Sequence, residues 1–251
     1  MKPDRPILVI SKCLGCAECR YDGTGVKGTR AESLHQVTRI VPVCPEEEIG
    51  LGTPRPPIRV VEGEAPCLYQ PETGRDLTDR MIRFTETFLD RLDEVDGFLL
   101  KSRSPSCGVR DAKVYVDEDS EELSDRRGPG LFARGVLQRH PLLPIEDERR
   151  LRDAAIWERF VTRLFAAAAL RHATRQTDLK DLREFHEKVR SFIEDCSRAA
   201  LERIEGIVEN REQRPPIEVV KNYRDEYLRA LRRLPAKEPR FPGRPPIEVL
   251  E

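Results

Sequence analysis

The chain has 251 residues, of which 38% are hydrophobic and 35% charged, enough for one large domain or two small ones with a real core. Its formal net charge is -1, so no overall field points to nucleic acid or to a membrane surface. The apolar run in MKPDRPILVI is too short for a signal peptide and no run approaches a transmembrane helix, so we expect a cytoplasmic protein.

The first part of the chain alternates expected strands and helices. In chain order these are strands over 6–11, 37–43 and 58–63, a helix over 77–95, strands over 97–102 and 112–117, a helix over 128–140 and a strand over 142–146. The first helix has Met81, Phe84 and Phe88 at helical spacing, and Pro129 lies in the first turn of the second. The alternation predicts an α/β fold with a largely parallel sheet and flanking helices.

From Asp147 onward the pattern becomes entirely helical. We expect a long helix over 147–173 with Asp147 as its N-cap, one or two helices over 178–209 and another over 215–234. The sequence therefore predicts two domains, an α/β domain at 1–146 and an all-helical domain at 147–251. The helical part is large enough to fold by itself.

Cysteine is the residue type that points to chemistry. The segment SKCLGCAECRYDG places Cys13, Cys16 and Cys19 three residues apart on one expected loop, and the whole chain has seven cysteines. Thiols stay reduced in the cytoplasm, where clustered cysteines indicate metal binding or catalysis more often than disulfides. The odd number also leaves one cysteine over in any scheme built only from disulfides.

Three cysteines follow three different expected strands. Cys13 comes after strand 6–11, Cys44 directly follows strand 37–43, and Cys107 lies shortly after strand 97–102. Ligands of open α/β sheets bind beyond the carboxyl ends of the strands, so we expect the three thiols to meet at one edge of the sheet. Three soft thiolates at one point favour an iron–sulfur cluster or zinc. Cys67 and Cys196 are interpreted as structural.

Two other interpretations stay open from the residues alone. The spacing of Cys13, Cys16 and Cys19 matches the first part of the ferredoxin pattern C-x2-C-x2-C-x3-C-P, although the cysteine before proline, Cys44, is distant. An iron–sulfur electron carrier or redox sensor using these four cysteines is therefore the main alternative. The other is a zinc-stabilised α/β domain whose helical tail binds a protein partner.

Three segments together resemble a known family. ISKCLGCAECRYDG (10–23), PVCPEEEIGLGTPRPP (42–57) and LLKSRSPSCG (99–108) resemble the signature blocks of the thiouracil desulfurase family, in the same order. The helical remainder, through LREFHEKVRSFI (182–193) and PPIEVL (245–250), resembles the YbgA-type domain often fused behind that desulfurase domain. Such fused chains are similar to bacterial desulfidases that remove sulfur from 4-thiouridine in tRNA.

The resemblance implies a cofactor and catalytic residues. Cys13, Cys44 and Cys107 fall on the family cysteines that hold a [4Fe–4S] cluster whose fourth iron has no protein ligand. Glu46 falls on the family's acidic residue and is the expected general base, and Ser104 falls on its catalytic serine. The expected reaction releases sulfide from a thiolated pyrimidine and leaves uracil or uridine, without net redox change.

This chain departs from the family pattern at two positions in the first block. Cys16 stands where glycine is usual, and Cys19 stands where an apolar residue is common. Either thiol closes the fourth iron, lies near the cluster without binding it, or receives the released sulfur, and the sequence does not choose. The expected substrate-binding residues, which grip the base or a phosphate, are Arg20, Tyr21, Asp22, Arg55, Lys101 and Ser106.

The resemblance to fused chains is the only argument for tRNA as the substrate. A thiolated pyrimidine in tRNA and a free thiopyrimidine base or nucleoside are both compatible with the motifs. The helical part has a slight excess of basic residues, but acids interrupt nearly every basic run, as on an ordinary solvated helix surface. An RNA-binding role for 147–251 is thus an expectation by analogy.

Overall fold

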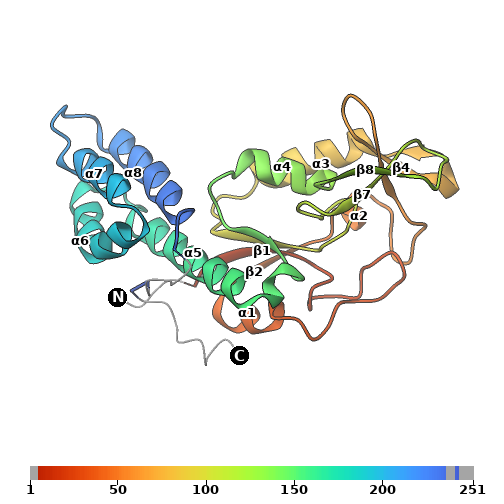
Figure 1. Cartoon of the computed structure of the whole chain (residues 1–251), viewed down its shortest axis with the longest axis horizontal. Coiled ribbons are helices and arrows are strands. Elements are labelled where there is room, and N and C mark those ends of the chain that lie inside the picture. The colour runs from red at the N-terminus through yellow and green to blue at the C-terminus, as the bar shows by residue number, and fades with distance from the viewer. Residues whose placement is uncertain (1–4, 236–240, 243–251) are drawn as a thin grey trace. The chain divides into compact units, whose positions relative to one another are not determined.

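A computed structural model of the chain describes residues 5–235 and 241–242 (Figure 1). It contains two compact units. The α/β unit comprises Ile7–Pro141 and Ile145–Arg152, and the helical unit comprises the rest, including the short segment Leu142–Pro144. The functional assignment of 1–146 to desulfidation and of 147–251 to a YbgA-like role stays a prediction.

A four-stranded, fully parallel sheet forms the centre of the α/β unit. Its order is β2 (Arg39–Val43), β1 (Ile7–Ser11), β6 (Gly97–Leu100) and β9 (Ile145–Asp147). Every residue of β1 and β6 is buried, because the runs ILVI and GFLL have apolar side chains for both faces. The predicted α/β class with a parallel sheet is confirmed, and the carboxyl ends of its strands lie at one edge.

Helices cover both faces of the parallel sheet. They are α1 (Ala31–Val37), α2 (Pro45–Glu48), α3 (Thr78–Asp90) and α4 (Leu131–Arg139). Figure 1 shows α3 and α4 on one side of the sheet and α1 on the other. The rings of Phe84 and Phe88 on α3 contact Phe132 on α4, with centroids 6.1 and 5.7 Å apart. The apolar positions that predicted the helix thus pack against its neighbour α4.

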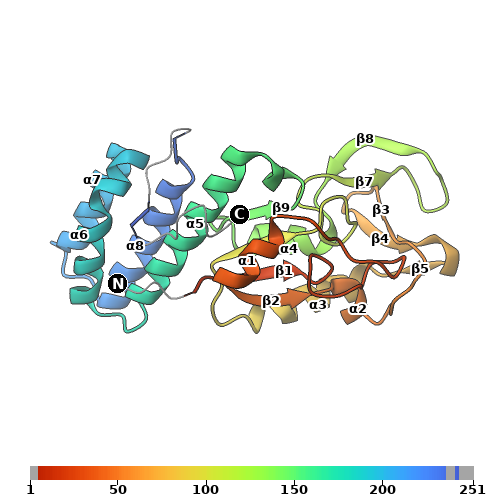
Figure 2. The same cartoon turned by 90° about the horizontal axis from the view of Figure 1, so that it is seen from below.

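A second sheet was not expected. Its order is β5 (Arg75–Asp76), β4 (Cys67–Gln70), β3 (Arg59–Val61), β7 (Ala112–Tyr115) and β8 (Leu123–Gly128), and Figure 2 shows β8 and β5 at its opposite edges. Of its pairings, only β3 with β7 is parallel. The placing of 58–63 and 112–117 in the parallel sheet was therefore wrong. Only a short connection separates β3 from β4, and the same holds for β7 and β8. Such connections permit antiparallel hairpins but are too short for a parallel crossover.

The helical unit contains four long helices among the described residues, where the sequence predicted three or four. They are α5 (Ala154–Ala173), α6 (Leu179–Cys196), α7 (Arg198–Glu209) and α8 (Pro216–Leu231). The segment 178–209 is two helices, because the Ser197 hydroxyl accepts the Ala200 N–H and caps a new start. The segment LREFHEKVRSFI lies on α6, whereas PPIEVL at 245–250 lies outside the described residues.

The prediction of a helix starting at Asp147 was wrong. Asp147 ends β9, and its carboxylate accepts the N–H groups of Arg149 and Arg150, which turns the chain into a short 3-10 helix (Arg150–Arg152). The N-cap of α5 is instead Asp153, whose side chain accepts the Ile156 N–H. Both aspartates have side chains that can cap a helix. Because Asp147 is held in β9 by pairing with β6, the helix begins only after Asp153.

Length and polarity of the helices bear on membrane insertion. Across the described part of the chain, no helix combines the length and the apolar character needed to cross a bilayer.

Candidate active site at the carboxyl end of the parallel sheet

Three cysteines line one pocket where adjacent strands end. Cys13 follows β1, Cys44 follows β2, and Cys107 lies in the loop after β6, and these strands are neighbours in the sheet. The pocket has a volume of about 540 Å³ and includes all three residues in its wall. The three thiols are buried and form no disulfide. Three loops that follow neighbouring strands thus bring together residues that are far apart in sequence.

The loop that carries Cys107 is held firmly. The Ser104 hydroxyl accepts the N–H groups of Ser106 and Cys107 at 3.1 and 3.0 Å. The first turn of α4 donates N–H groups to this loop, for example from Gly130 to the Gly108 carbonyl at 2.8 Å. A Cβ at Gly130 would lie 2.5 Å from the Pro105 carbonyl oxygen, so only glycine allows this approach. The loop therefore presents Ser104 and Cys107 in defined positions.

Glu46 lies in the first turn of α2 and contacts that loop. Its side chain is nearly buried, and its Oε2 accepts hydrogen bonds from Arg55 Nε at 2.9 Å and Nη2 at 2.7 Å. Its Oε1 accepts from the Ser106 hydroxyl at 3.0 Å and from the Ser104 hydroxyl at 3.4 Å. The carboxylate is thus oriented from both sides while it lines the pocket.

Each nitrogen of the Arg55 guanidinium donates hydrogen bonds to other groups of the protein. Besides Glu46, it donates from Nη1 to the Gly52 carbonyl at 2.7 Å and to the Thr53 hydroxyl at 3.1 Å, and from Nη2 to the Cys19 carbonyl at 3.1 Å. Burial by itself lowers the pKa of Arg55, but Glu46 outweighs it and the pKa lies above its ordinary value. This geometry favours positioning of Glu46 over the predicted grip on substrate.

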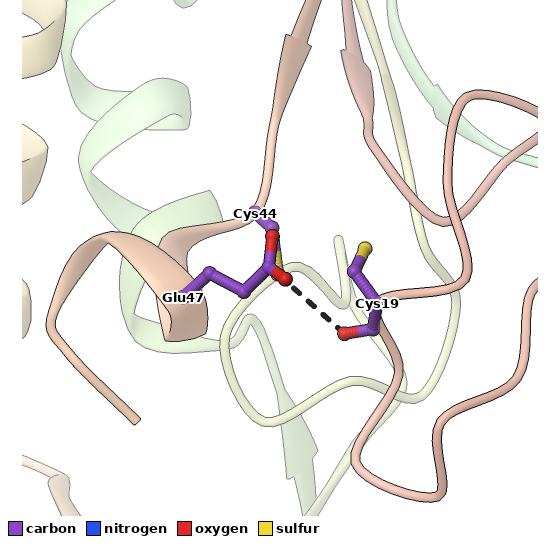
Figure 3. Close-up of side chains that lie close together, drawn as sticks. All are labelled: Cys19, Cys44 and Glu47. Atoms are coloured by element: carbon purple, nitrogen blue, oxygen red, sulfur yellow. Dashed lines mark hydrogen bonds between the residues drawn. The ribbon is translucent and has the colours of Figure 1, made fainter. Parts of the chain in front are cut away.

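The two additional cysteines of the first block differ in their surroundings. Cys19 is 2% exposed and lines the pocket, whereas Cys16 is exposed and is not among the described residues that line it. The Cys44 thiol donates to the Cys19 carbonyl at 3.8 Å (Figure 3). A closed cluster that needs Cys16 therefore gains no support from this arrangement.

Comparison with known proteins decides the family. The profile of the 2-thiouracil desulfurase family matches residues 8–148, more than half of the chain. The chain belongs to this family. Membership confirms the expectation of an enzyme that removes sulfur from a carbon–sulfur bond.

Two individual proteins are also similar to this desulfurase chain. The uncharacterized protein YbbK of Bacillus subtilis is 29% identical over 110 residues, which is 41% of this chain and 73% of YbbK. The solved structure of the [4Fe-4S]-dependent thiouracil desulfidase TudS is 29% identical, with a TM-score of 0.48, over 61% of this chain and 97% of that one.

The segment after Cys19 lies at the mouth of the desulfurase pocket. Arg20 and Tyr21 line it, and Tyr21 is 46% exposed with the Arg20 guanidinium 5.7 Å from its ring centroid. Asp22, in contrast, is not among the described lining residues. Its carboxylate accepts the N–H and hydroxyl of Thr24, which lowers the pKa of Asp22 and closes the turn. The geometry thus supports a turn role for Asp22.

Lys101 has a partner that the sequence analysis missed. Its Nζ lies 2.6 Å from Glu148, and the same buried carboxylate accepts the N–H and the hydroxyl of Ser102. Burial by itself raises the pKa of Glu148, but Lys101 and Ser102 bring it below its ordinary value. A signal was present, because Glu148 directly follows β9 and thus reaches the same sheet edge as the cysteines.

Lys12 and Glu47 are a second missed pair. Lys12 lines the pocket beside Cys13, and its Nζ lies 2.7 Å from the Glu47 carboxylate. This hydrogen bond raises the pKa of Lys12 and lowers that of Glu47. Glu47 stands in a run of three glutamates, and no spacing in the sequence singles it out.

Basic side chains dominate the pocket wall. They come from both sheets and from the loops between them: Lys12, Arg20, Arg55, Arg59, Lys101, Arg103, Lys113 and Arg149. Among the described lining residues, Glu46 is the only acid. Arg59 and Tyr115 reach the pocket from the second sheet, where the guanidinium lies 4.3 Å from the ring centroid. The sequence offered no signal for this contribution, since the second sheet itself was not predicted.

Proposed function

We propose that this enzyme removes sulfur from a thiolated pyrimidine nucleotide, such as 4-thiouridine in tRNA, with a [4Fe–4S] cluster held by Cys13, Cys44 and Cys107. The observation that carries the proposal is the meeting of these three thiols and Glu46 in one pocket of a chain that belongs to the 2-thiouracil desulfurase family. The thiols require reducing surroundings, in keeping with a cytoplasmic enzyme.

The donor set fits such a cluster. Cys13, Cys44 and Cys107 are free and buried, and sulfur donors are the usual ligands of iron–sulfur clusters. Burial raises the pKa of the Cys107 thiol to about 12, so cluster insertion must displace its proton. When bound, the cluster supplies a soft Lewis acid that withdraws electron density from a thiocarbonyl carbon through its sulfur.

Glu46 is the group that handles the protons. It accepts a proton from the water that attacks the thiocarbonyl carbon, and then returns it to the ring nitrogen or the leaving sulfur. Arg55 and Ser106 orient the carboxylate for this task from opposite sides. Ser104 lies in the Cys107 loop with its hydroxyl 3.4 Å from Glu46, and in this proposal it donates a hydrogen bond to the water or to the new carbonyl oxygen. The products are the oxo-pyrimidine and hydrogen sulfide, without net electron transfer.

The charge of the pocket supports a substrate with phosphate groups. Arg103, Lys113 and Arg149 are exposed at its wall and form no ion pair within residues 5–235 and 241–242. A free thiouracil base has no anionic group that requires them, whereas a nucleotide presents phosphates to such side chains. Tyr21 offers an exposed ring for stacking on a base. A direct contribution of the helical unit to RNA binding remains part of the proposal.

The test is an anaerobic activity assay. The full chain is loaded with iron and sulfide and incubated with bulk tRNA containing 4-thiouridine, with 4-thiouridine monophosphate and with free thiouracil. We expect loss of the near-ultraviolet absorbance of the thiopyrimidine and release of sulfide, faster with the nucleotides than with the base. Equal rates on all three would refute the nucleotide preference, and no sulfide from any of them would refute desulfidation of these substrates.

Removal of the three unpaired cations should weaken nucleotide binding selectively. We expect Arg103→Ala, Lys113→Ala and Arg149→Ala together to raise KM for tRNA by about tenfold, which corresponds to about 1.4 kcal/mol. KM for free thiouracil should be unchanged, and the salt dependence of tRNA binding should become shallower because fewer phosphates are neutralised. Arg80→Ala on the exposed face of α3 is the control. An equal rise in KM for the free base would contradict the phosphate role.

A further inference from the structure

The pocket contains one thiol more than the proposed cluster requires. Cys13, Cys44 and Cys107 occupy the three motif positions, and Cys19 lines the same pocket with only 2% exposure. Its near neighbour Cys16 is exposed and does not line the pocket within the part of the chain that the structure describes. The structure thus separates two cysteines that the sequence could not distinguish.

Cys19 lies close to one of the motif cysteines, Cys44. The ligand atoms of Cys19, Cys44 and Glu47 all lie within 4.8 Å of one another, and Figure 3 shows the three side chains turned toward a common space. These surroundings are donors suited to a metal and differ from the apolar contacts of a structural core cysteine.

The backbone holds Cys19 in this place. Its carbonyl accepts Arg55 Nη2 at 3.1 Å and the Cys44 thiol at 3.8 Å. Arg55 is itself paired with Glu46, so Cys19 is connected to the same buried network as the proposed base. The thiol is therefore kept close to the motif cysteines at high effective concentration.

We propose that Cys19 is an exchangeable fourth protein ligand of the cluster, bound to the open iron when substrate is absent and displaced by the sulfur of the substrate. This inference rests on the proposed function. Thiolate and thiocarbonyl sulfur are both soft donors and compete for the same metal position. On displacement the bond from Cys19 sulfur to iron breaks, the bond from substrate sulfur forms, and the released thiolate takes up one proton from water; no electron is transferred.

The exchange has two measurable consequences. A substrate-free cluster with four protein ligands keeps its fourth iron on mild oxidation, whereas a cluster with three loses it readily. Removal of Cys19 should therefore accelerate iron loss by on the order of 10²-fold, the low end of the gain from a tethered extra ligand. It should also tighten binding of thiouracil, because the substrate no longer has to displace a thiolate.

The experiment compares the full-length holoprotein with Cys19→Val, which nearly preserves side-chain volume, and with Cys16→Ala as the matched control. Each protein is treated anaerobically with ferricyanide as the one-electron oxidant. The iron released is measured together with the electron paramagnetic resonance signal of a three-iron cluster. We expect rapid iron loss only in Cys19→Val, and tighter binding of thiouracil to that variant before oxidation.

Each contrary result has a defined meaning. Equal iron loss in the wild type and in Cys19→Val would overturn the ligand role of Cys19, while sulfide release from thiopyrimidines would leave the proposed function standing. If Cys19→Val and a second variant, Cys19→Ala, are folded by circular dichroism but hold no cluster, Cys19 is an obligatory ligand and exchange is refuted. Iron loss as expected without sulfide release from any substrate would support the ligand role and refute the proposed function.

Discussion

Glu46→Gln should lower the turnover of thiopyrimidine desulfidation by about 10²–10⁴-fold, the usual contribution of a positioned proton-transfer group. Glutamine is nearly isosteric and still accepts a hydrogen bond from Arg55, but its amide cannot take a proton from water. The carboxylate is oriented by Arg55 and Ser106, so little else in the pocket needs to change. Sulfide release under substrate saturation measures the effect.

Iron and sulfide content must accompany this measurement. Glu46 is not among the proposed cluster ligands, so Glu46→Gln should load as much iron as the wild type. Glu48→Gln is the matched control, because Glu48 lies on the same short helix but is exposed and away from the described pocket wall. A Glu46→Gln enzyme with a full cluster and wild-type turnover would remove Glu46 from the mechanism.

Cys44→Ala should abolish both the cluster and the activity. Cys44 is the proposed ligand at the end of β2, and its thiol also donates to the Cys19 carbonyl. Loss of one of three obligatory ligands leaves a pocket that cannot compete for iron under dilute conditions. We expect iron, acid-labile sulfide and desulfidation all to fall to background after reconstitution and desalting.

Cys67→Ala is the matched control for this experiment. Cys67 belongs to the same α/β unit but lies on β4 in the second sheet, outside the described pocket wall. It should keep its full cluster. Retention of iron and sulfide by Cys44→Ala would contradict the proposed ligand set, and zinc without acid-labile sulfide in the wild type would favour the zinc-stabilised alternative.

The sequence by itself determined the class of fold and the location of the chemistry. The runs ILVI and GFLL are apolar on both faces, a pattern that suits buried parallel strands, and the structure has β1 and β6 at the centre of the parallel sheet. Because parallel strands end at one edge, Cys13, Cys44 and Cys107 were expected to meet, and they line one pocket. Local pattern and strand direction were sufficient for this step.

The second sheet could not be predicted from the sequence, because the local signals for its strands are weak. Strands β4, β5 and β8 are short or largely exposed, so their periodicity is too faint to predict pairing. The start of α5 was misplaced for a related reason. Asp147 and Asp153 have the same capping chemistry, and only the pairing of β9 with β6 shows that the chain is still extended at Asp147.

Tertiary contacts also decided which side chains enter the site and what each of them contacts there. Cys16 and Cys19 belong to the same motif, yet Cys16 is exposed, whereas Cys19 is buried close to Cys44. Arg55 matched a candidate for substrate binding by its motif, but burial forces its guanidinium to use every donor on Glu46, Thr53 and carbonyl groups. Burial and long-range hydrogen bonding depend on where distant segments come to lie, and no spacing along one chain contains that information.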